Sequence, residues 1–333
     1  MFLRGNVPRG MATPLGTTSQ GGEEMIIYGA GMAGLLAANL LRRFKPIVKE
    51  VQSELPNNHS ALLRFRTPHV GSACGIPFEK VKVQKAISYE GKIFNDPNLF
   101  FSNNYSLKVS GAVESRSIDN LGNAERYIAP LNLIELMAAN CNINYNQEFT
   151  SKDLPITNKK VPIISTIPMP VMMNIVNWDQ VPEFKYKKIW SQIGIIEEPD
   201  ATVYQTIYYP DPLMTLYRAS VMGNVIIAEH CRKPEQSEGP VLMHSLRDDF
   251  GILVTKIDSI RSSEQKYGKI LPIDERLRKE FIYYLTKEYG IYSLGRFATW
   301  RQLLLDDIVN DVTVIEKFIE SEMEYDLSLY QNL

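Results

Sequence analysis

The chain has few of the residues from which covalent cross-links and metal sites are built. Among its 333 residues there are three cysteines, Cys74, Cys141 and Cys231, and no CxxC pair. So scattered a set argues against a disulfide framework and against structural zinc, and it indicates a reducing compartment. No apolar run approaches the roughly 20 residues that a membrane span needs. We therefore predict a cytoplasmic protein with no membrane partner and no bound metal.

The chain also lacks a strong net charge. Its 36 Lys and Arg residues nearly balance 38 Asp and Glu residues, for a formal charge of −2. No overall field attracts nucleic acid, so nucleic acid is not the predicted partner, although a nucleotide substrate stays open. The hydrophobic share of 44% is typical of a globular protein, and the length suffices for two intermeshed domains. We expect a small-molecule substrate, and the oligomeric state is left undetermined.

Residues 1–24 differ from the sequence that follows them. They are rich in Gly, Pro, Ser and Thr, and they lack the apolar core of a signal peptide. We predict that they form a flexible leader and that folded structure starts at Met25.

The stretch "MIIYGAGMAGLLAANLLRRFKPIVKE", residues 25–50, has the order strand, glycine-rich turn, helix and strand. Its turn matches GxGxxG, in which the first glycine permits a tight turn and the second lets the backbone approach a pyrophosphate. The third glycine allows the helix to pack closely, and the start of the helix offers unpaired N–H groups to phosphates. The predicted phosphate-binding residues are Gly29, Ala30, Gly31, Met32, Ala33 and Gly34.

Glu50 strengthens this prediction because it follows Gly29 by 21 residues, at the end of the second strand. A carboxylate at that place accepts hydrogen bonds from the ribose hydroxyls and repels a 2′-phosphate. The motif therefore predicts FAD or NAD rather than NADP. The alternative is a structural turn with an incidental glutamate, which the complete strand-turn-helix context disfavours.

Beyond Glu50 the pattern changes from alternating strands and helices to sheet-rich segments. Residues 80–94 alternate like antiparallel strands, and residues 184–229 are rich in strand-forming residues. Between them, residues 131–141 read as a helix, and residues 161–173 read as a strand followed by a proline-initiated helix. We therefore predict an α/β fold in which sheet-forming insertions interrupt the nucleotide-binding unit.

Several motifs in one order carry a family resemblance. "GAGMAG" with Glu50, "ISTIPMP", "YYPDPLMTLYRAS", "YGKILPID" and "GRFATWRQLLLDDIV" resemble the flavoproteins of the amine oxidase and UDP-galactopyranose mutase superfamily. The resemblance implies FAD as cofactor and a Rossmann-like FAD-binding domain with an inserted antiparallel β-sheet substrate domain. It divides the chain into FAD-binding parts at 25–75, 131–175 and 261–333, and substrate parts at 76–130 and 176–260. The mutases' additional helical region has no evident counterpart in residues 95–130.

The same resemblance implies roles for residues outside the glycine motif. A Pro-His pair beside the flavin corresponds to Pro68 and His69, and an arginine that binds substrate phosphate corresponds to Arg218. A late Gly-Arg pair at the flavin corresponds to Gly295 and Arg296. The alternatives are a loop histidine satisfied by backbone for His69 and a solvent-facing strand charge for Arg218.

Leu305, Asp306 and Asp307 open the last amphipathic helix of the chain. The N-terminal end of this helix is predicted to stabilise negative charge at a flavin ring, and helix capping by the two aspartates is the alternative. Ordinary packing is the favoured interpretation of Tyr204, Tyr208, Tyr209 and Tyr217. Lys266 and Lys269 are predicted to be solvated charges in a turn.

The leading hypothesis is an FAD-dependent, amine-oxidase-like oxidoreductase that takes a hydride from a small donor, in which His69 and Arg218 are the candidate catalytic residues. One alternative is a redox-neutral, mutase-like flavoenzyme acting on a nucleotide sugar, and another is a non-catalytic FAD- or NAD-binding module. The abundance of Asn, Ile, Lys and Tyr also resembles flavoprotein-like reading frames of large bacteriophages. That resemblance implies a host-cytoplasmic protein and a nucleotide-linked or amine substrate.

Overall fold

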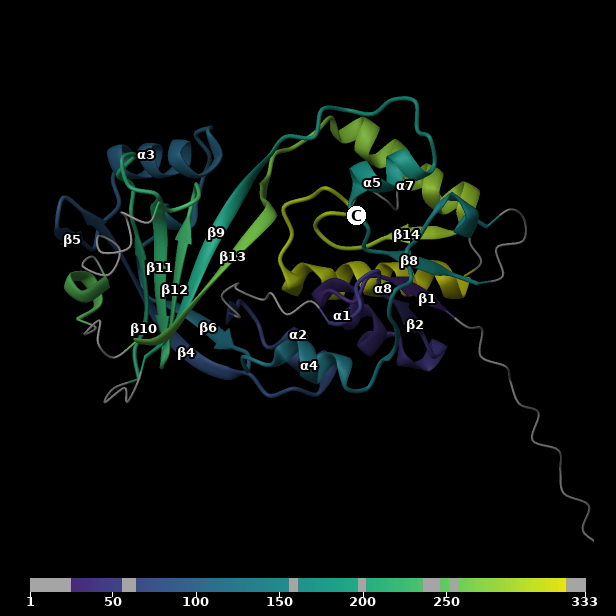
Figure 1. Ribbon diagram of the computed structural model, residues 1–333, viewed down its shortest axis with the longest axis horizontal. Coiled ribbons are helices and arrows are strands. Elements are labelled where there is room, and N and C mark those ends of the chain that lie inside the picture. Colours follow the sequence, from purple (N-terminus) through teal and green to yellow (C-terminus); the bar gives the residue numbers. More distant parts are fainter. Residues whose placement is uncertain are drawn as a thin grey trace, which may run out of the picture.

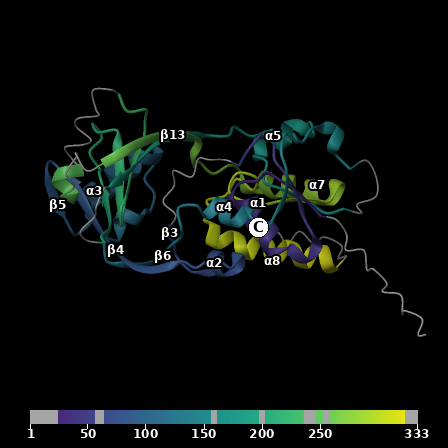
Figure 2. The same ribbon diagram turned by 60° about the horizontal axis from the view of Figure 1, so that its bottom comes forward.

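The computed structural model describes residues 25–55, 64–155, 161–196, 202–235, 246–251 and 257–321. It contains two β-sheets that lie at opposite ends of an elongated molecule (Figure 1). A parallel sheet wrapped by helices occupies one end, and a larger curled sheet occupies the other (Figure 2). The predicted leader, residues 1–24, falls outside the described residues.

The first sheet has five strands in the order β14-β8-β1-β2-β7, and every pair in it is parallel. Its strands are short and largely apolar; Ile27 of β1 and Val48 of β2, for example, are fully buried. Apolar runs of this kind are what a parallel sheet covered on both faces requires. The strands are β1 (Ile26–Tyr28), β2 (Ile47–Lys49), β7 (Asn142–Asn144), β8 (Ile163–Ser165) and β14 (Ile291–Ser293).

Helices pack around the first sheet and share one continuous core with it. α1 lies centrally and contacts α2, α4 and α8, so the segment after β1 is held by elements from both ends of the chain. As predicted, α5 begins beside a proline. The helices are α1 (Met32–Leu40), α2 (His69–Cys74), α4 (Leu133–Ala138), α5 (Met169–Ile175), α7 (Glu275–Tyr289) and α8 (Leu305–Ser321).

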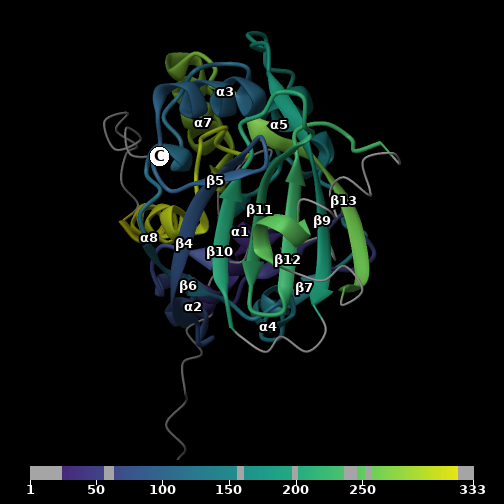
Figure 3. The same ribbon diagram turned by 90° about the vertical axis from the view of Figure 1, so that its left-hand side faces the viewer.

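The second sheet has nine strands in the order β13-β9-β12-β11-β10-β4-β6-β3, with β5 paired to β4 (Figure 3). It is mixed rather than wholly antiparallel, because β10 runs parallel to β4. No hairpin joins these two strands; a long crossover connects them, as parallel neighbours require. The strands are β3 (Arg64–Phe65), β4 (Glu79–Tyr89), β5 (Lys92–Phe94), β6 (Ala124–Ile128), β9 (Tyr186–Ile196), β10 (Tyr204–Tyr208), β11 (Leu216–Met222), β12 (Val225–His230) and β13 (Ile257–Ile270).

A helix that the sequence analysis did not find, α3 (Leu99–Ser110), packs on one face of the second sheet. Its Tyr105 ring lies 5.3 Å from the ring of Tyr208, and both side chains are buried. The polar residues interspersed through the helix hide its periodicity. Its ends carry the local signals instead, because the Asn98 side chain accepts a hydrogen bond from the Phe101 amide and Gly111 adopts a positive φ of 83°.

Two predicted segment boundaries need correction. β13 pairs with β9 along its length, so residues 261–270 belong to the second sheet and not to the C-terminal FAD-binding part. β3 pairs with β6, so residues 64–65 also lie in the second sheet, although they were assigned to the segment 25–75. Both strands lie where the chain passes between the two sheets, and sequence pattern alone does not assign such a strand to one sheet.

Candidate functional site

The glycine turn, residues 29–34, lies at the carboxyl edge of the parallel sheet. Gly29 follows β1 with a φ of +102°, and a Cβ there would stand 2.1 Å from the Thr166 Oγ1. A Cβ on Gly34 would stand 1.9 Å from the carbonyl oxygen of Gly29. Both positions therefore exclude every residue except glycine, the first through its backbone conformation and the close threonine, the second through helix packing.

Gly31 differs from these two positions. A Cβ at this position would meet no atom within 4 Å, so it would enter open space. Gly31 is the N-cap of α1, which has no side-chain cap and no acidic residue in its first turn. The amide end of the helix is thus left facing that space, in the arrangement that receives a phosphate. The backbone here fits the pyrophosphate of a dinucleotide.

Glu50 is held beside this turn by the register of β1 and β2, which pairs Tyr28 with Lys49. Its side chain is buried, and the residue is 6% exposed. The carboxylate accepts hydrogen bonds from the Ala30 amide at 2.6 Å and from the Gln52 amide at 3.0 Å. A carboxylate has about four lone-pair positions, so acceptor capacity remains for a ribose.

Gly295 brings a distant segment to the same turn. It follows β14 with a φ of +90°, and a Cβ there would lie 2.9 Å from the Cβ of Ala33. The amide of Leu294 donates to the carbonyl of Ser165 at 2.9 Å, which fixes this loop against β8. The strand order reverses between β1 and β8, and such switch points are where open α/β sheets bind ligands. The predicted residues of the turn, Glu50 and Gly295 thus gather at one edge.

The two aspartates at the start of α8 bind the protein itself. Asp306 accepts hydrogen bonds from the Thr67 hydroxyl at 2.6 Å and from the Thr67 amide at 3.0 Å, and Asp307 accepts from the Leu304 amide at 2.8 Å. These contacts favour capping and anchoring for both carboxylates, which was the alternative interpretation. Cofactor contact by Leu305, Asp306 and Asp307 stays a prediction.

The anchor made by Asp306 also positions His69. This residue is exposed and opens α2, and its amide lies 3.4 Å from the Thr67 hydroxyl that Asp306 holds. α2 contacts both α1 and α8. His69 therefore lies on the helix next to the glycine turn, and its role at a flavin stays a prediction.

Arg218 lies in the second sheet and is paired rather than solvent-facing. Its guanidinium makes a bidentate ion pair with Glu229 of β12, with Nη2 at 2.7 Å from Oε1. The Tyr217 hydroxyl donates to the same carboxylate at 3.0 Å. A β-bulge shifts the register between Leu216 and Arg218, so that consecutive residues both reach Glu229. Burial opposes ionisation, yet Arg218 holds the pKa of Glu229 below its usual value.

Arg218 interacts electrostatically with Arg64 and Lys269, and Lys269 also interacts with Arg116 and Arg296. We call these five side chains the cation cluster: Arg64, Arg116, Arg218, Lys269 and Arg296. Burial and then repulsion by Arg218 lower the pKa of Arg64 to about 10. The Arg296 Nη2 donates to the Gly268 carbonyl at 3.3 Å, and its Nε is buried without a partner among the described residues. Two carboxylates pair with members of the cluster: Glu229 with Arg218, and Glu114 with Arg116 at 2.7 Å.

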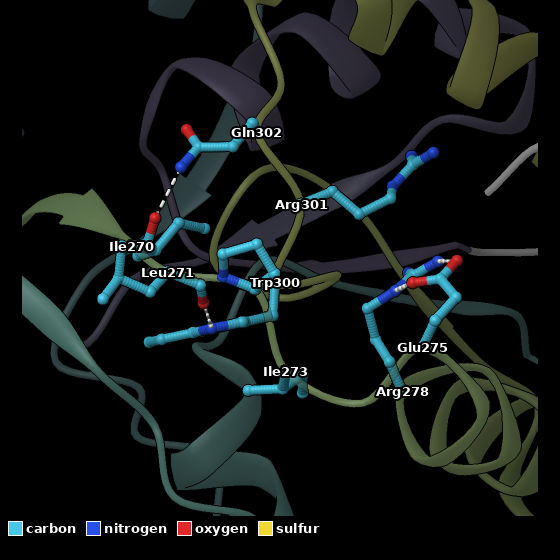
Figure 4. Close-up of a pocket in the computed structure, with 9 residues that line it drawn as sticks. Ile270, Leu271, Ile273, Glu275, Arg278, Trp300, Arg301 and Gln302 are labelled. Atoms are coloured by element: carbon cyan, nitrogen blue, oxygen red, sulfur yellow. Dashed lines mark hydrogen bonds and ion pairs between the residues drawn. The ribbon is translucent and has the colours of Figure 1, made fainter. Parts of the chain in front are cut away.

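A cavity of about 200 Å³ lies beside the loop that follows Gly295 (Figure 4). The Trp300 indole donates to the Leu271 carbonyl at 2.9 Å, and Gln302 donates to the Ile270 carbonyl at 2.5 Å. These bonds tie the loop to the end of β13. The cavity is smaller than the roughly 300 to 1,000 Å³ of ordinary ligand pockets, so we regard it as part of this joint.

The chain resembles known proteins in its structure, whereas its sequence matches none of those compared. No family model matches the chain, and no curated protein matches its sequence. A reduced UDP-galactopyranose mutase aligns over 93% of this chain and 96% of its own, with a TM-score of 0.66 at 14% identity. The chain therefore shares the fold of this mutase. PqsL, a probable FAD-dependent monooxygenase from Pseudomonas aeruginosa, aligns over 92% of this chain and 90% of its own, with a TM-score of 0.55 at 13% identity.

A third solved structure extends the same likeness. A flavoprotein/dehydrogenase from Cytophaga hutchinsonii aligns over 92% of this chain and 80% of its own, with a TM-score of 0.52 at 13% identity. The expected Rossmann-like architecture with a second, strand-rich part is confirmed by these matches. At such identities the fold is what the proteins share, and nothing in these matches bears on a bacteriophage origin.

In the described part of the chain, no helix is long and apolar enough to cross a bilayer. Nor do three or more His, Cys, Asp or Glu side chains of those residues come together as metal ligands would.

Sequence reasoning assigned no role to five residues of these sites: Arg64, Arg116, Thr166, Glu229 and Lys269. Glu229 carried a signal, since it is the one acid within the apolar strand "VIIAEH". Lys269 was wrongly placed as a solvated charge in a turn, because it lies in β13 and is half-buried. Among the tyrosines, the packing interpretation agrees with the burial of Tyr208, Tyr209 and Tyr217, each of which is 1% exposed.

Proposed function

We propose that the chain is an FAD-dependent oxidoreductase that takes a hydride from a small substrate bearing an anionic group. The observation that carries the proposal is the open space at Gly31, flanked by Glu50 and Gly295, in a chain with a flavoprotein fold. FAD bound at this edge would supply the hydride acceptor.

The chain's own residues divide the work of holding FAD. The amides at the start of α1, around Gly31, would bind the diphosphate, and Glu50 would accept hydrogen bonds from the ribose hydroxyls. The loop at Gly295 lies against Ala33 and so continues the same edge. The first amides of α8, from Leu305, would face negative charge on the ring. Each of these contacts uses backbone or a carboxylate that is already oriented.

The charge of the neighbouring site favours an anionic donor over a cationic amine. The carboxylate of Glu229 is engaged by Arg218 and Tyr217, and Glu114 pairs with Arg116, so no ion pair among the described residues neutralises Lys269 or Arg296. Arginine side chains bind carboxylates and phosphates through two parallel N–H donors. Arg296, together with the part of the Arg218 guanidinium that Glu229 leaves unengaged, would therefore hold the anionic group of the substrate. The bond to be oxidised would lie toward the glycine turn.

A redox-neutral mutase acting on a nucleotide sugar is the second candidate. The fold match to a UDP-galactopyranose mutase, with a TM-score of 0.66, favours it, and a cation cluster also suits a diphosphate. The two candidates differ in whether the flavin must be reduced before the reaction begins. The oxidoreductase is active as isolated and becomes reduced by its donor, whereas the mutase works only after prior reduction and consumes no electrons.

The first experiment is an absorption spectrum of the purified protein before and after incubation with FAD. We expect bands near about 375 and 450 nm that denaturation releases as free FAD. Replacement of Glu50 by Gln should weaken FAD binding about tenfold, whereas the exposed Glu54→Gln should not change it. A wild-type protein that cannot be loaded with FAD contradicts the proposal.

The second experiment separates the two candidates. The FAD-loaded protein is mixed, in the absence of oxygen, with small hydroxy acids, amino acids and phosphorylated alcohols. Reduction of the flavin is followed as loss of its absorption band at about 450 nm. Bleaching by an anionic donor supports the oxidoreductase. Turnover of a nucleotide sugar only after dithionite reduction would establish the mutase instead.

A further inference from the structure

Lys269 occupies an irregular place in β13. The register of β13 against β9 shifts between Gln265 and Lys269, and a Cβ on the intervening Gly268 would lie 2.4 Å from the Ile189 side chain. A bulge of this kind changes the direction of the following side chain. The Lys269 Nζ lies 5.7 Å from the centroid of the Tyr217 ring, and the residue is half-buried.

The groups around Lys269 come from several elements, and most of them are cations. β11 contributes Arg218, the loop after β14 contributes Arg296, and the segment before residues 117–119 contributes Arg116. β12 contributes the acid that acts on Lys269, Glu229, and the register partner on β9 is Lys187. Arg116 is itself paired with Glu114 at 2.7 Å.

Lys269 has no ion pair in the described part of the chain, because the nearby carboxylate serves Arg218 and Tyr217. Burial, and then the charge of Arg218, lower the pKa of Lys269 to about 7. A lysine in this state carries a free lone pair in a large fraction of molecules at neutral pH.

The other groups of this cluster cannot accept a proton near pH 7. Arginine side chains in proteins are not deprotonated near neutral pH. The ion pair with Glu229 also raises the pKa of Arg218 against the effect of burial. Burial raises the pKa of Tyr217 well above its usual value, so its hydroxyl stays protonated as well. Glu229 is ionised, but three hydrogen bonds occupy it. Lys269 alone combines a vacant lone pair with a place in the cluster.

Lys269 is also connected to the glycine turn. The Gly268 carbonyl, which precedes it, accepts a hydrogen bond from Arg296. Arg296 follows Gly295, which lies against Ala33 in the first turn of α1. The residue before Lys269 is thus linked through Arg296 and Gly295 to the edge that would hold the cofactor.

We propose that the Lys269 Nζ accepts the proton that the substrate loses when it is oxidised, an inference that rests on the proposed function. Oxidation of an alcohol or amine carbon removes one hydride from carbon and one proton from oxygen or nitrogen. The hydride, with its electron pair, goes to the flavin, and the proton goes to the Nζ lone pair, leaving a carbonyl or imine and an ammonium. Arg218 and Arg296 hold the anionic group while the proton moves.

The first test measures the titration of Lys269 directly and needs neither cofactor nor substrate. Competitive acetylation of the full chain from about pH 5 to 11 is read out by mass spectrometry, with the exposed Lys266 as internal reference for reagent activity. We expect the labelling of Lys269 to rise with a midpoint near pH 7. A midpoint near the ordinary lysine value, about 10.4, overturns the proposal.

The second test uses the flavin as a reporter. In FAD-loaded wild-type protein we expect the visible spectrum to shift with a midpoint near pH 7 as Lys269 gains its proton. The shift should be absent in Lys269→Met and Lys269→Arg, and it should persist in Lys266→Met. An unchanged titration in Lys269→Met overturns the proposal.

The same variants report on the reaction once a donor has been found by anaerobic bleaching. The bleaching rate of the wild type should rise with pH through about 7, and that of Lys269→Met should be at least about 100-fold lower. Added methylamine should restore part of the rate in Lys269→Met and none in Lys269→Arg. If the donor bleaches the wild type and Lys269→Met at the same rate, the proton-transfer role of Lys269 is refuted and the proposed function stands. If the wild type does not bind FAD, the proposed function itself is refuted.

Discussion

The glycine turn and the cation cluster are both candidate binding surfaces, but they are built by opposite means. At the turn, backbone conformation and the absence of side-chain atoms create the space, as Gly31 and Gly34 demonstrate. In the cluster, large charged side chains fill the space, and the Arg218–Glu229 pair compensates for their burial. The turn is encoded within residues 25–50, whereas the cluster needs strands that are far apart in sequence. The two regions should therefore respond differently to substitution.

The largest effect on stability is expected from Gly34→Ala, which should disrupt the glycine turn and leave the cation cluster unchanged. Its new Cβ would stand 1.9 Å from the backbone oxygen of Gly29, an atom that cannot rotate away. We expect the free energy of unfolding in urea to fall by at least about 3 kcal/mol. In the exposed Gly122→Ala the nearest atom would be 3.6 Å away, so its midpoint should stay close to wild type. Equal midpoints for the two variants would show that the turn can relax.

The corresponding destabilising substitution in the cation cluster is Glu229→Gln. It leaves the Arg218 charge without a carboxylate in a pair whose side chains are 24% and 13% exposed. Loss of one partner of a buried ion pair lowers the free energy of unfolding by up to about 3 to 5 kcal/mol. Because Arg218 is partly exposed, we expect a decrease of about 3 kcal/mol. Urea unfolding measures it.

A paired replacement tests the origin of that loss. Arg218→Met combined with Glu229→Leu removes both charges, and it should recover at least half of the stability lost in Glu229→Gln. FAD binding at the turn should remain within about twofold of wild type in Glu229→Gln, since its contacts lie elsewhere. A double variant as unstable as the single one would mean that packing, not charge, explains the loss.

Gly31→Ala sharpens the comparison because it should separate folding from binding. The new Cβ meets no atom within 4 Å, so urea unfolding without FAD should change by less than about 1 kcal/mol. In the bound state the methyl group would occupy the approach of the diphosphate, and the Kd for FAD should rise about 10- to 100-fold. Fluorescence quenching of FAD measures this. If Gly31→Ala binds FAD as tightly as the wild type does, the diphosphate binds at another place.

The smallest effect is expected from Asp306→Ala, at the link between α8 and the segment before His69. Loss of the hydrogen bonds to Thr67 should lower stability by about 1 kcal/mol. Hydrogen exchange should accelerate at the Arg66 and Thr67 amides, which donate to Asp306. In Asp307→Ala the faster exchange should appear at the Leu304 amide instead. If exchange at Thr67 is unchanged in Asp306→Ala, the segment is held by other contacts.

Sequence reasoning predicted the parts whose interactions are local. The strand, turn and helix of residues 25–50 were predicted with their glycines, because steric rules at Gly29 and Gly34 act over a few residues. The α3 helix was missed because tertiary packing of Phe101 and Tyr105 stabilises it more than any amphipathic pattern does. The assignment of residues 261–270 was wrong because strand pairing with β9 has no local signature.

The sequence by itself determined the α/β class, the glycine turn and the carboxylate that follows it, because these depend on residue types at fixed short spacings. Tertiary structure alone decided the environment of Lys269 and Arg218. Two bulges and the pairing of β9, β11, β12 and β13 bring their side chains into electrostatic range of each other and of Arg296. Burial and Coulomb interactions depend on distance in space, so no pattern along the chain could reveal that one lysine lies among three arginines with its nearest acid already engaged.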